Sequence, residues 1–233
     1  MSREYYCTPA DLSGNKTVYS VNTHAERPYI KIIAYRNCVV VCTSEDLRSR
    51  VRELLRGKTR DEIFELPLVY GQTIHFVPGG VCGEDIPVPP GYECESLFGG
   101  GILTLAGLTG FENSLAFDEN GHTPAAAVCV ARRNGRLIGV AGASKSPISG
   151  LLEIGIDVAK EHRNVGLGTC LVRRLTKELL ARNIVPFYSA SVTNLGSQMV
   201  ASRSGYIPCW VDTFGTILDG SSAYNHLTGL LSL

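Results

Sequence analysis

The sequence contains 233 residues, which is enough for one large domain or two small ones. Lysine and arginine together number 22, as do aspartate and glutamate, so the formal net charge is zero and does not favour a nucleic acid or an anionic membrane as partner. Hydrophobic residues make up 44% and charged residues 19%, a composition that excludes a disordered chain.

The location of the protein is predicted from features that the sequence lacks. No apolar run reaches the roughly 18 residues of a membrane span, and the first residues contain no signal-peptide core, so we expect a cytoplasmic protein with no membrane partner. Eight cysteines, several of them inside apolar runs as Cys129 is, are expected to be buried, reduced thiols. They form no C-x-x-C pair and the five histidines are scattered, so we expect no metal site.

Residues 1–100 are predicted to form an N-terminal α/β segment of unknown function. Residues 1–26 are polar and mixed, and we expect them to be loosely structured. Alternating apolar residues, capping residues and glycine or proline breaks predict strands at 29–35, 38–42 and 68–77 and helices at about 45–56 and 59–65. Gly57-Lys58-Thr59 is not a nucleotide-binding P-loop, because Arg52 occupies the position of its first glycine and no strand precedes it.

A segment rich in chain breakers follows. Residues 78–101 contain Gly-Gly, Pro-Pro and Gly-Gly-Gly clusters, which are typical of a connection or of a flap over an active site. We therefore predict a domain boundary near residue 100, with a second domain at 101–233.

The second domain is predicted to contain short helices within 102–117 and then a hairpin. Apolar runs at 125–132 and 136–143 flank Asn134-Gly135, the strongest short-range hairpin signal. Period-two alternation predicts a strand at 151–158, and leucines spaced four apart predict a helix at 167–182. A strand at 207–214 is expected later, and residues 224–231 either form a short terminal helix or cover a sheet edge.

A short turn, Arg163-Asn164-Val165-Gly166-Leu167-Gly168, lies between that strand and that helix. The N-terminus of a helix has backbone N–H groups without partners, and the helix dipole adds positive potential there, so the turn suits a phosphate or pyrophosphate. Its glycines allow a phosphate to approach the backbone closely. The alternative is an ordinary glycine-containing connection, which is common. His162, just before the turn, is expected at the surface.

The R-x-x-G-x-G spacing of this turn resembles the acetyl-CoA loop of the GNAT superfamily of N-acetyltransferases, in which Arg or Gln is followed by x-x-G-x and then Gly or Ala. The resemblance covers about the last 110 residues, including a strand at 185–190 and a helix from Asn194 that ends in Gly205-Tyr206. It implies an α/β fold whose mixed, mostly antiparallel sheet is flanked by helices and has splayed parallel fourth and fifth strands. Residues 1–100 would be an extra N-terminal part.

The resemblance also implies acetyl-CoA or CoA as the cofactor. The pantetheine arm would bond the fourth strand as an added strand does, and the N–H of Val158 would polarise the thioester carbonyl. Asn194 either binds this arm or only caps the next helix, and Arg163 either reaches a phosphate or pairs with Glu161. The implied cofactor-binding residues are Ile156, Asp157, Val158, Arg163, Asn164, Val165, Gly166, Leu167, Gly168, Thr169, Asn194 and Ser197.

The implied reaction is direct attack of a primary amine on acetyl-CoA in a ternary complex. An ammonium must first lose a proton, and Glu153 is our candidate base, although the usual base position of the family is held by Leu152. The position of the family's acid tyrosine is held by Ala201. The acid is therefore left open between Ser197, Ser202, Tyr206 and none at all, because a thiol of pKa about 8.5 leaves readily.

A second function class stays open: a non-catalytic module that binds acyl-CoA or regulates a partner. The missing tyrosine and the position of Glu153 favour it. For the enzyme, we expect a small-molecule or peptide amine as acceptor, whose identity the fold does not determine. A homodimer is left open as well.

Overall fold

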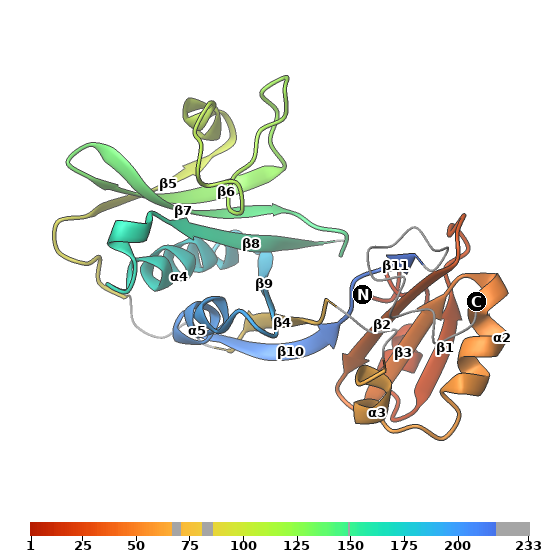
Figure 1. Cartoon of the computed structure of the whole chain (residues 1–233). Helices are drawn as coiled ribbons and strands as arrows, with labels where there is room; N and C mark the ends of the chain where they lie inside the picture. The colour runs from red at the N-terminus through yellow and green to blue at the C-terminus, as the bar shows by residue number, and fades with distance from the viewer. Residues whose placement is uncertain (67–70, 81–85, 149, 218–233) are drawn as a thin grey trace. The chain divides into compact units, whose positions relative to one another are not determined.

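The computed structural model describes residues 1–66, 71–80, 86–148 and 150–217 (Figure 1). Two compact units are distinguished by their internal contacts. Unit 1 consists of Met1–His75 together with the chain from Cys209 onward, and unit 2 consists of Phe76–Pro208. The chain passes from unit 1 to unit 2 within β4 (Thr73–Pro78) and returns within β10 (Tyr206–Asp212). The domain boundary that we expect near residue 100 stays a prediction.

Unit 1 contains a sheet in the order β1-β3-β2-β10, with β11 (Thr216–Ile217) also paired to β2. Its first three strands are β1 (Thr17–Val21), β2 (Tyr29–Tyr35) and β3 (Cys38–Thr43); β1 is parallel to β3, and β2 is antiparallel to β3 and β10. The helices are α1 (Pro9–Leu12), α2 (Glu45–Leu54) and α3 (Arg60–Phe64). Strand residues such as Ile32 and Val41 pack against Leu47, Val51 and Ile63 of the helices, which forms the core of the unit.

The predicted elements of unit 1 are largely confirmed. Strands β2 and β3 and helices α2 and α3 lie where the sequence places them. The expectation for residues 1–26 is wrong, because they contain α1 and β1. A capping box between Thr8 and Asp11 begins α1, and β1 is held by parallel pairing with β3, a contact that no local pattern specifies. Strand β4 begins at Thr73 rather than near residue 68, and residues 67–70 lie outside the described residues.

Unit 2 contains a sheet in the order β9-β8-β7-β6-β5. Its strands are β5 (Glu93–Phe98), β6 (Ala125–Arg133), β7 (Arg136–Lys145), β8 (Leu151–Val158) and β9 (Val185–Ser191). All neighbours are antiparallel except β8 and β9, which are parallel because α4 (Leu167–Leu180) connects them. Two 3-10 helices, η1 (Gly99–Leu105) and η2 (Lys160–His162), and α5 (Leu195–Arg203) complete the unit. The expected mixed, mostly antiparallel sheet is confirmed.

Two helical layers bury opposite faces of the sheet. Leu171, Leu175 and Leu179 of α4 are fully buried. On the other face, Ile102 of η1 and Phe111 pack against Val128, Val130 and Val140 in a second core cluster. The breaker-rich segment is not only a connection, since β5 lies inside it and pairs Cys94 with Ala131 of β6. The helix or edge expected at 224–231 lies outside the described residues.

The pairing of β8 with β9 ends before either strand does. Its last paired residues are Ile154 and Tyr188, whereas β8 continues to Val158 and β9 to Ser191. Strand β8 stays with β7 along this stretch, where Val158 is paired with Gly139. The two parallel strands therefore diverge, which confirms the splayed arrangement and leaves one edge of β8 open to a ligand.

Candidate functional site

The turn between β8 and α4 presents backbone donors. Gly166 is the N-cap of α4 and has φ +84°, and Asn164 also has a left-handed backbone with φ +63°. Among the described residues, the amides from Asn164 to Thr169 have no backbone acceptor, as expected for the first turn of a helix and the turn before it. Residues 163–166 are exposed, Leu167 and Thr169 are buried, and nothing lies within 4 Å of the position that a Cβ on Gly166 would take. The exposed part of the turn is therefore accessible to an anion.

Two side chains hold the beginning of this turn. The Nε of Arg163 donates to the carbonyl oxygen of Val158 at 2.8 Å, so the guanidinium lies over the end of β8, and the described residues show no ion pair between Arg163 and Glu161. The hydroxyl of Tyr92 lies 2.7 Å from Nδ1 of His162, and the two rings pack edge to face. His162 is therefore half-buried, and the expectation that it is at the surface is wrong.

The open edge of β8 carries the backbone groups of Ile156 and Val158. Ala159 donates its N–H to Ile138 of the neighbouring β7 segment at 2.8 Å, and successive residues of a strand direct their backbone groups to opposite sides. Asp157 and Ala159 therefore face β7, whereas Ile156 and Val158 face the side that β9 leaves. The side-chain amide of Asn113 donates to the carbonyl oxygen of Ile156 at 3.1 Å.

One face of the diverging strands carries carboxylates. Glu153 is half-buried, and its Oε1 accepts a hydrogen bond from the hydroxyl of Ser189 on β9. Asp157 lies on the same face by alternation, and its Oδ2 accepts from the backbone N–H of Ser114 at 2.8 Å and from its hydroxyl at 2.9 Å. Asp157 is therefore fixed to the segment before β6, whereas Glu153 has one neutral partner.

Two opposed glycines allow that segment to lie flat on the sheet. Gly142 and Gly155 are paired in the β7–β8 ladder. A Cβ on Gly155 would lie 2.0 Å from the carbonyl oxygen of Asn113, and one on Gly142 would lie 1.7 Å from that of Ser114. Only residues without a side chain fit there, so this pair determines where residues 113 and 114 cover the carboxylate face.

The opposite face carries hydroxyl groups. Tyr188, at the last paired position of β9, is 1% exposed, and its hydroxyl lies 2.8 Å from Oγ of Ser197 in the first turn of α5. Burial raises the pKa of Tyr188, so it remains a neutral phenol at physiological pH. The side chain of Asn194 accepts from the N–H of Ser197 at 3.1 Å, which is the capping role.

The other acid candidates are less favourably placed. Ala201 is fully buried, and Ser202 is exposed. The hydroxyl of Tyr206 lies 2.7 Å from Oγ1 of Thr176 on α4, inside the core. Ser197 is therefore the one of the three hydroxyl candidates that lies next to the diverging strands. Asp157, Glu153 and Val158 come from β8, and the predicted loop residues gather at its end.

Four residues at this site could not be found from the sequence: Asn113, Ser114, Tyr188 and Ser189. Alternation along β9 places the side chains of Tyr188 and Ser189 on opposite faces of the sheet. Only the register of β9 against β8 brings Ser189 next to Glu153. Ser114 comes from a segment without a regular pattern.

Some expected features are tested only in part. Seven cysteines belong to the described residues and all are free, and Cys82 lies outside them. In the described ranges, no three His, Cys, Asp or Glu side chains gather as a metal site requires. No helix of the described part is long and apolar enough to cross a bilayer.

Comparison with known proteins gives one family match. Residues 105–206 match the model of the acetyltransferase (GNAT) family. No curated protein matches the chain.

Solved structures show more distant similarity. A GNAT-family protein from Novosphingobium aromaticivorans is 19% identical, with a TM-score of 0.46 over 61% of this chain and 63% of that one. A GCN5-related N-acetyltransferase-like protein from Streptococcus suis is 16% identical, with a TM-score of 0.44 over 76% and 71%. A GNAT-family acetyltransferase from Colwellia psychrerythraea is 12% identical, with a TM-score of 0.46 over 62% and 56%. This chain thus spans less than two thirds of the first and third of these proteins.

Proposed function

We propose, from the match of residues 105–206 to the GNAT family model, that this chain is an N-acetyltransferase that moves the acetyl group of acetyl-CoA to a primary amine. One observation carries the proposal. The R-x-x-G-x-G turn presents accessible amides without backbone acceptors at the start of α4, directly after the strand whose edge is open.

The residues of the turn fit a diphosphate. Their amides are the donors that an anion at a helix N-terminus requires, and Gly166 leaves space for it. Arg163 adds a positive charge beside the turn. The residues that would hold the diphosphate are Arg163, Asn164, Val165, Gly166, Leu167, Gly168 and Thr169.

The open edge of β8 fits the rest of the cofactor. When bound, acetyl-CoA supplies an activated thioester. The backbone of Ile156 and Val158 would bind the pantetheine arm as a paired strand does, and the N–H of Val158 would stabilise negative charge on the carbonyl oxygen. Asn194 caps α5 through its oxygen, and its amide nitrogen would bind the arm.

Glu153 is the proposed general base. Its carboxylate accepts one hydroxyl hydrogen bond, so it retains acceptor capacity for the proton of the amine, directly or through a water. Asp157 would position the 113–114 segment instead, because Ser114 donates to it twice. Ser197, whose hydroxyl is hydrogen-bonded to that of Tyr188, would supply a proton to the departing thiolate and so replace the tyrosine that the family uses.

The proposed acceptor is a small-molecule or peptide amine, and the reaction would take place in the cytoplasm. The free thiols of the seven described cysteines support a reducing compartment. A homodimer would be compatible with this reaction but is not required by it.

Thiol release from acetyl-CoA with a panel of amines, combined with calorimetry of CoA binding, tests the proposal. We expect CoA to bind and thiol to appear only with certain amines. Binding without turnover for any amine would instead support the non-catalytic acyl-CoA-binding module, which the missing tyrosine at Ala201 favours. Absence of CoA binding would contradict both.

A further inference from the structure

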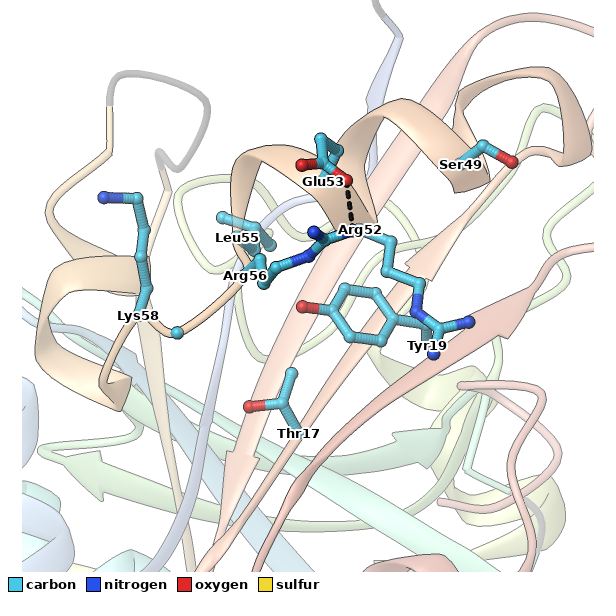
Figure 2. Close-up of a pocket in the computed structure, with 9 residues that line it drawn as sticks. Thr17, Tyr19, Ser49, Arg52, Glu53, Leu55, Arg56 and Lys58 are labelled. Atoms are coloured by element: carbon cyan, nitrogen blue, oxygen red, sulfur yellow. Dashed lines mark hydrogen bonds and ion pairs between the residues drawn. The ribbon is translucent and has the colours of Figure 1, made fainter.

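Unit 1 contains a hollow of its own, with a volume of about 620 Å³ (Figure 2). One side is formed by β1 and the other by α2 and the turn that follows it. Its lining residues are Thr17, Tyr19, Ser49, Arg52, Glu53, Leu55, Arg56, Gly57 and Lys58. The volume lies within the range of small-molecule sites, which is about 300–1,000 Å³.

The hollow gathers positive charge in a chain whose formal net charge is zero. The lining contains three cations, Arg52, Arg56 and Lys58, and one carboxylate, Glu53, so its formal charge is +2. Glu53 is paired with Arg56. Among the described residues, Arg52 and Lys58 form no ion pair. Glu62 lies near Lys58: hydrogen bonds from Thr59 lower the pKa of Glu62, and the charge of Lys58 lowers it further by a smaller amount.

Arg52 is held in place by an aromatic ring. The carbon at the centre of its guanidinium lies 5.8 Å from the centroid of Tyr19, within the range of a cation–π contact. A guanidinium over a ring keeps the N–H groups of its edge available, and these match the oxygens of a phosphate in a bidentate arrangement. The ring reduces the freedom that Arg52 must lose on binding a ligand.

The shape and polarity of the hollow suit the same ligand. Leu55 is buried beneath it, and the hydroxyls of Thr17, Tyr19 and Ser49 supply further hydrogen-bonding groups around it. Gly57 has φ +74°, and no atom lies within 4 Å of the position that its Cβ would take, so this part of the rim is open.

Basic residues after a helix also interact favourably with its last carbonyl groups. That interaction alone explains Arg56 and Lys58 but not the position of Arg52, whose guanidinium lies over Tyr19 on the neighbouring strand. A phosphate monoester carries a charge of about −1.5 to −2 near neutral pH. The formal charge of +2 on the lining is therefore opposite in sign and similar in size.

We propose that this hollow binds a phosphate group, held by Arg52, Arg56 and Lys58. The group would belong either to inorganic phosphate or to a small organic phosphate. Contacts would come from side chains, since Gly57-Lys58-Thr59 follows a helix and forms no P-loop. This inference is independent of the proposed acetyl transfer.

Titration of the full chain with inorganic phosphate and with phenyl phosphate, followed by calorimetry at about 0.15 M salt, tests the proposal. The Gly166→Glu protein is titrated in parallel, and only binding that persists in it is counted, so that binding at the turn after β8 is not included. We expect saturable binding with a Kd of about 1 mM or tighter for at least one probe. Tighter binding of phenyl phosphate indicates an organic phosphate, and equal or tighter binding of inorganic phosphate indicates the free ion.

Arg52→Ala and Lys58→Ala are each expected to weaken this binding about tenfold or more, as the loss of a charge-assisted contact does. Arg48→Ala is the matched control, because Arg48 lies on the same helix, pairs with Glu45 and does not line the hollow. No saturable binding of either probe would overturn the proposal. Equal affinity in the Arg52→Ala and Arg48→Ala proteins would overturn it as well.

Discussion

At the scale of single residues, the proposed reaction depends on proton transfer by two side chains on opposite faces of the diverging strands. Glu153 lies beside Ser189 on the face covered by residues 113 and 114, and Ser197 lies beside Tyr188 on the face covered by the helices. A base and an acid on separate faces suit a reaction in which the amine and the thiol are at opposite sides of the carbonyl carbon.

Glu153→Gln is expected to lower turnover at pH 7 about a hundredfold, because the amide cannot accept the proton of the amine. CoA affinity should stay unchanged, since the groups proposed to bind the cofactor lie at the open edge of β8, in the turn after it and at the start of α5. Turnover measured against pH and calorimetry with CoA check both expectations, with Glu161→Gln, at an exposed position of η2, as control. Equal rates in mutant and parent across the pH range would show that Glu153 takes no part in proton transfer.

Ser197→Ala is expected to lower turnover about tenfold, a modest effect because a thiol of pKa near 8.5 needs little assistance to leave. It should also reduce the preference for CoA over desulfo-CoA in binding, which isolates a contact to sulfur. Ser202→Ala, a change at an exposed serine of the same helix, is the control. An unchanged preference between the two ligands would show that Ser197 does not contact the sulfur.

At the scale of elements, the site is formed by a strand, a turn and a helix that must meet in one geometry. Gly166 permits the left-handed backbone at the start of α4, and the Gly142–Gly155 pair permits residues 113 and 114 to lie on the sheet. The positions of these glycines decide which atoms reach the site.

Gly166→Glu is expected to reduce CoA affinity at least a hundredfold, because it places bulk and negative charge at the proposed diphosphate site and removes several charge-assisted contacts. The strained backbone should cost about 1–2 kcal/mol of folding free energy. Gly107→Glu is the matched control, since Gly107 is exposed, has φ +83° and likewise has no atom near the position of its Cβ. Calorimetry and thermal unfolding separate the two effects. Similar CoA affinity in the two variants would show that the turn does not bind the diphosphate.

Gly155→Ala is expected to destabilise the fold by about 2 kcal/mol or more, because the new methyl group meets backbone rather than a flexible side chain. The 113–114 segment must shift, so the Ser114–Asp157 hydrogen bonds should be lost and the amide of Ser114 should exchange with solvent faster. Denaturant unfolding and hydrogen exchange measure both changes. Gly100→Ala, where no atom lies within 4 Å, is the control. Unchanged exchange at Ser114 would contradict the expectation.

At the scale of the whole molecule, one buried carboxylate joins segments that are far apart in the sequence of unit 1. Asp212 accepts from the hydroxyl of Tyr5 at 2.5 Å, lies 2.8 Å from Nε2 of His75 and lies 3.5 Å from Nζ of Lys31. Burial alone would raise the pKa of Asp212, but hydrogen bonds and charge from His75, with smaller effects of Tyr5 and Lys31, lower it on balance.

This lowered pKa gives a signed dependence of stability on pH. A carboxyl whose pKa is lower in the folded than in the unfolded chain stabilises the fold above its unfolded pKa, about 3.9, and loses that effect as pH falls through the folded value. Asp212→Asn is therefore expected to lower the free energy of unfolding at pH 7 by about 3 kcal/mol, and this difference from the parent should shrink below about pH 4.

Denaturant unfolding at several pH values checks this expectation, with Asp46→Asn, at an exposed position of α2, as the control. The control should change stability by no more than about 0.5 kcal/mol. A difference for Asp212→Asn that stays constant down to pH 2 would show that ionisation of this carboxyl does not contribute.

The sequence alone determined the features that depend on neighbours along the chain. Alternation and apolar runs predicted β2, β3, β6, β7 and β8, and four-residue spacing predicted α4. The Asn134-Gly135 turn predicted the hairpin of β6 and β7. The turn from Arg163 to Gly168 was also found in this way, because its glycine spacing and its place before a helix are local properties.

Only the tertiary structure decided which distant segments meet. It pairs β1 with β3 and β5 with β6. It also places Ser189 next to Glu153 and Ser197 next to Tyr188, and Asn113 and Ser114 pack against two glycines. The physical reason is that strand register and packing across a sheet depend on complementarity between residues far apart in sequence. A shift of one residue reverses which face each side chain occupies, and no local pattern fixes that choice.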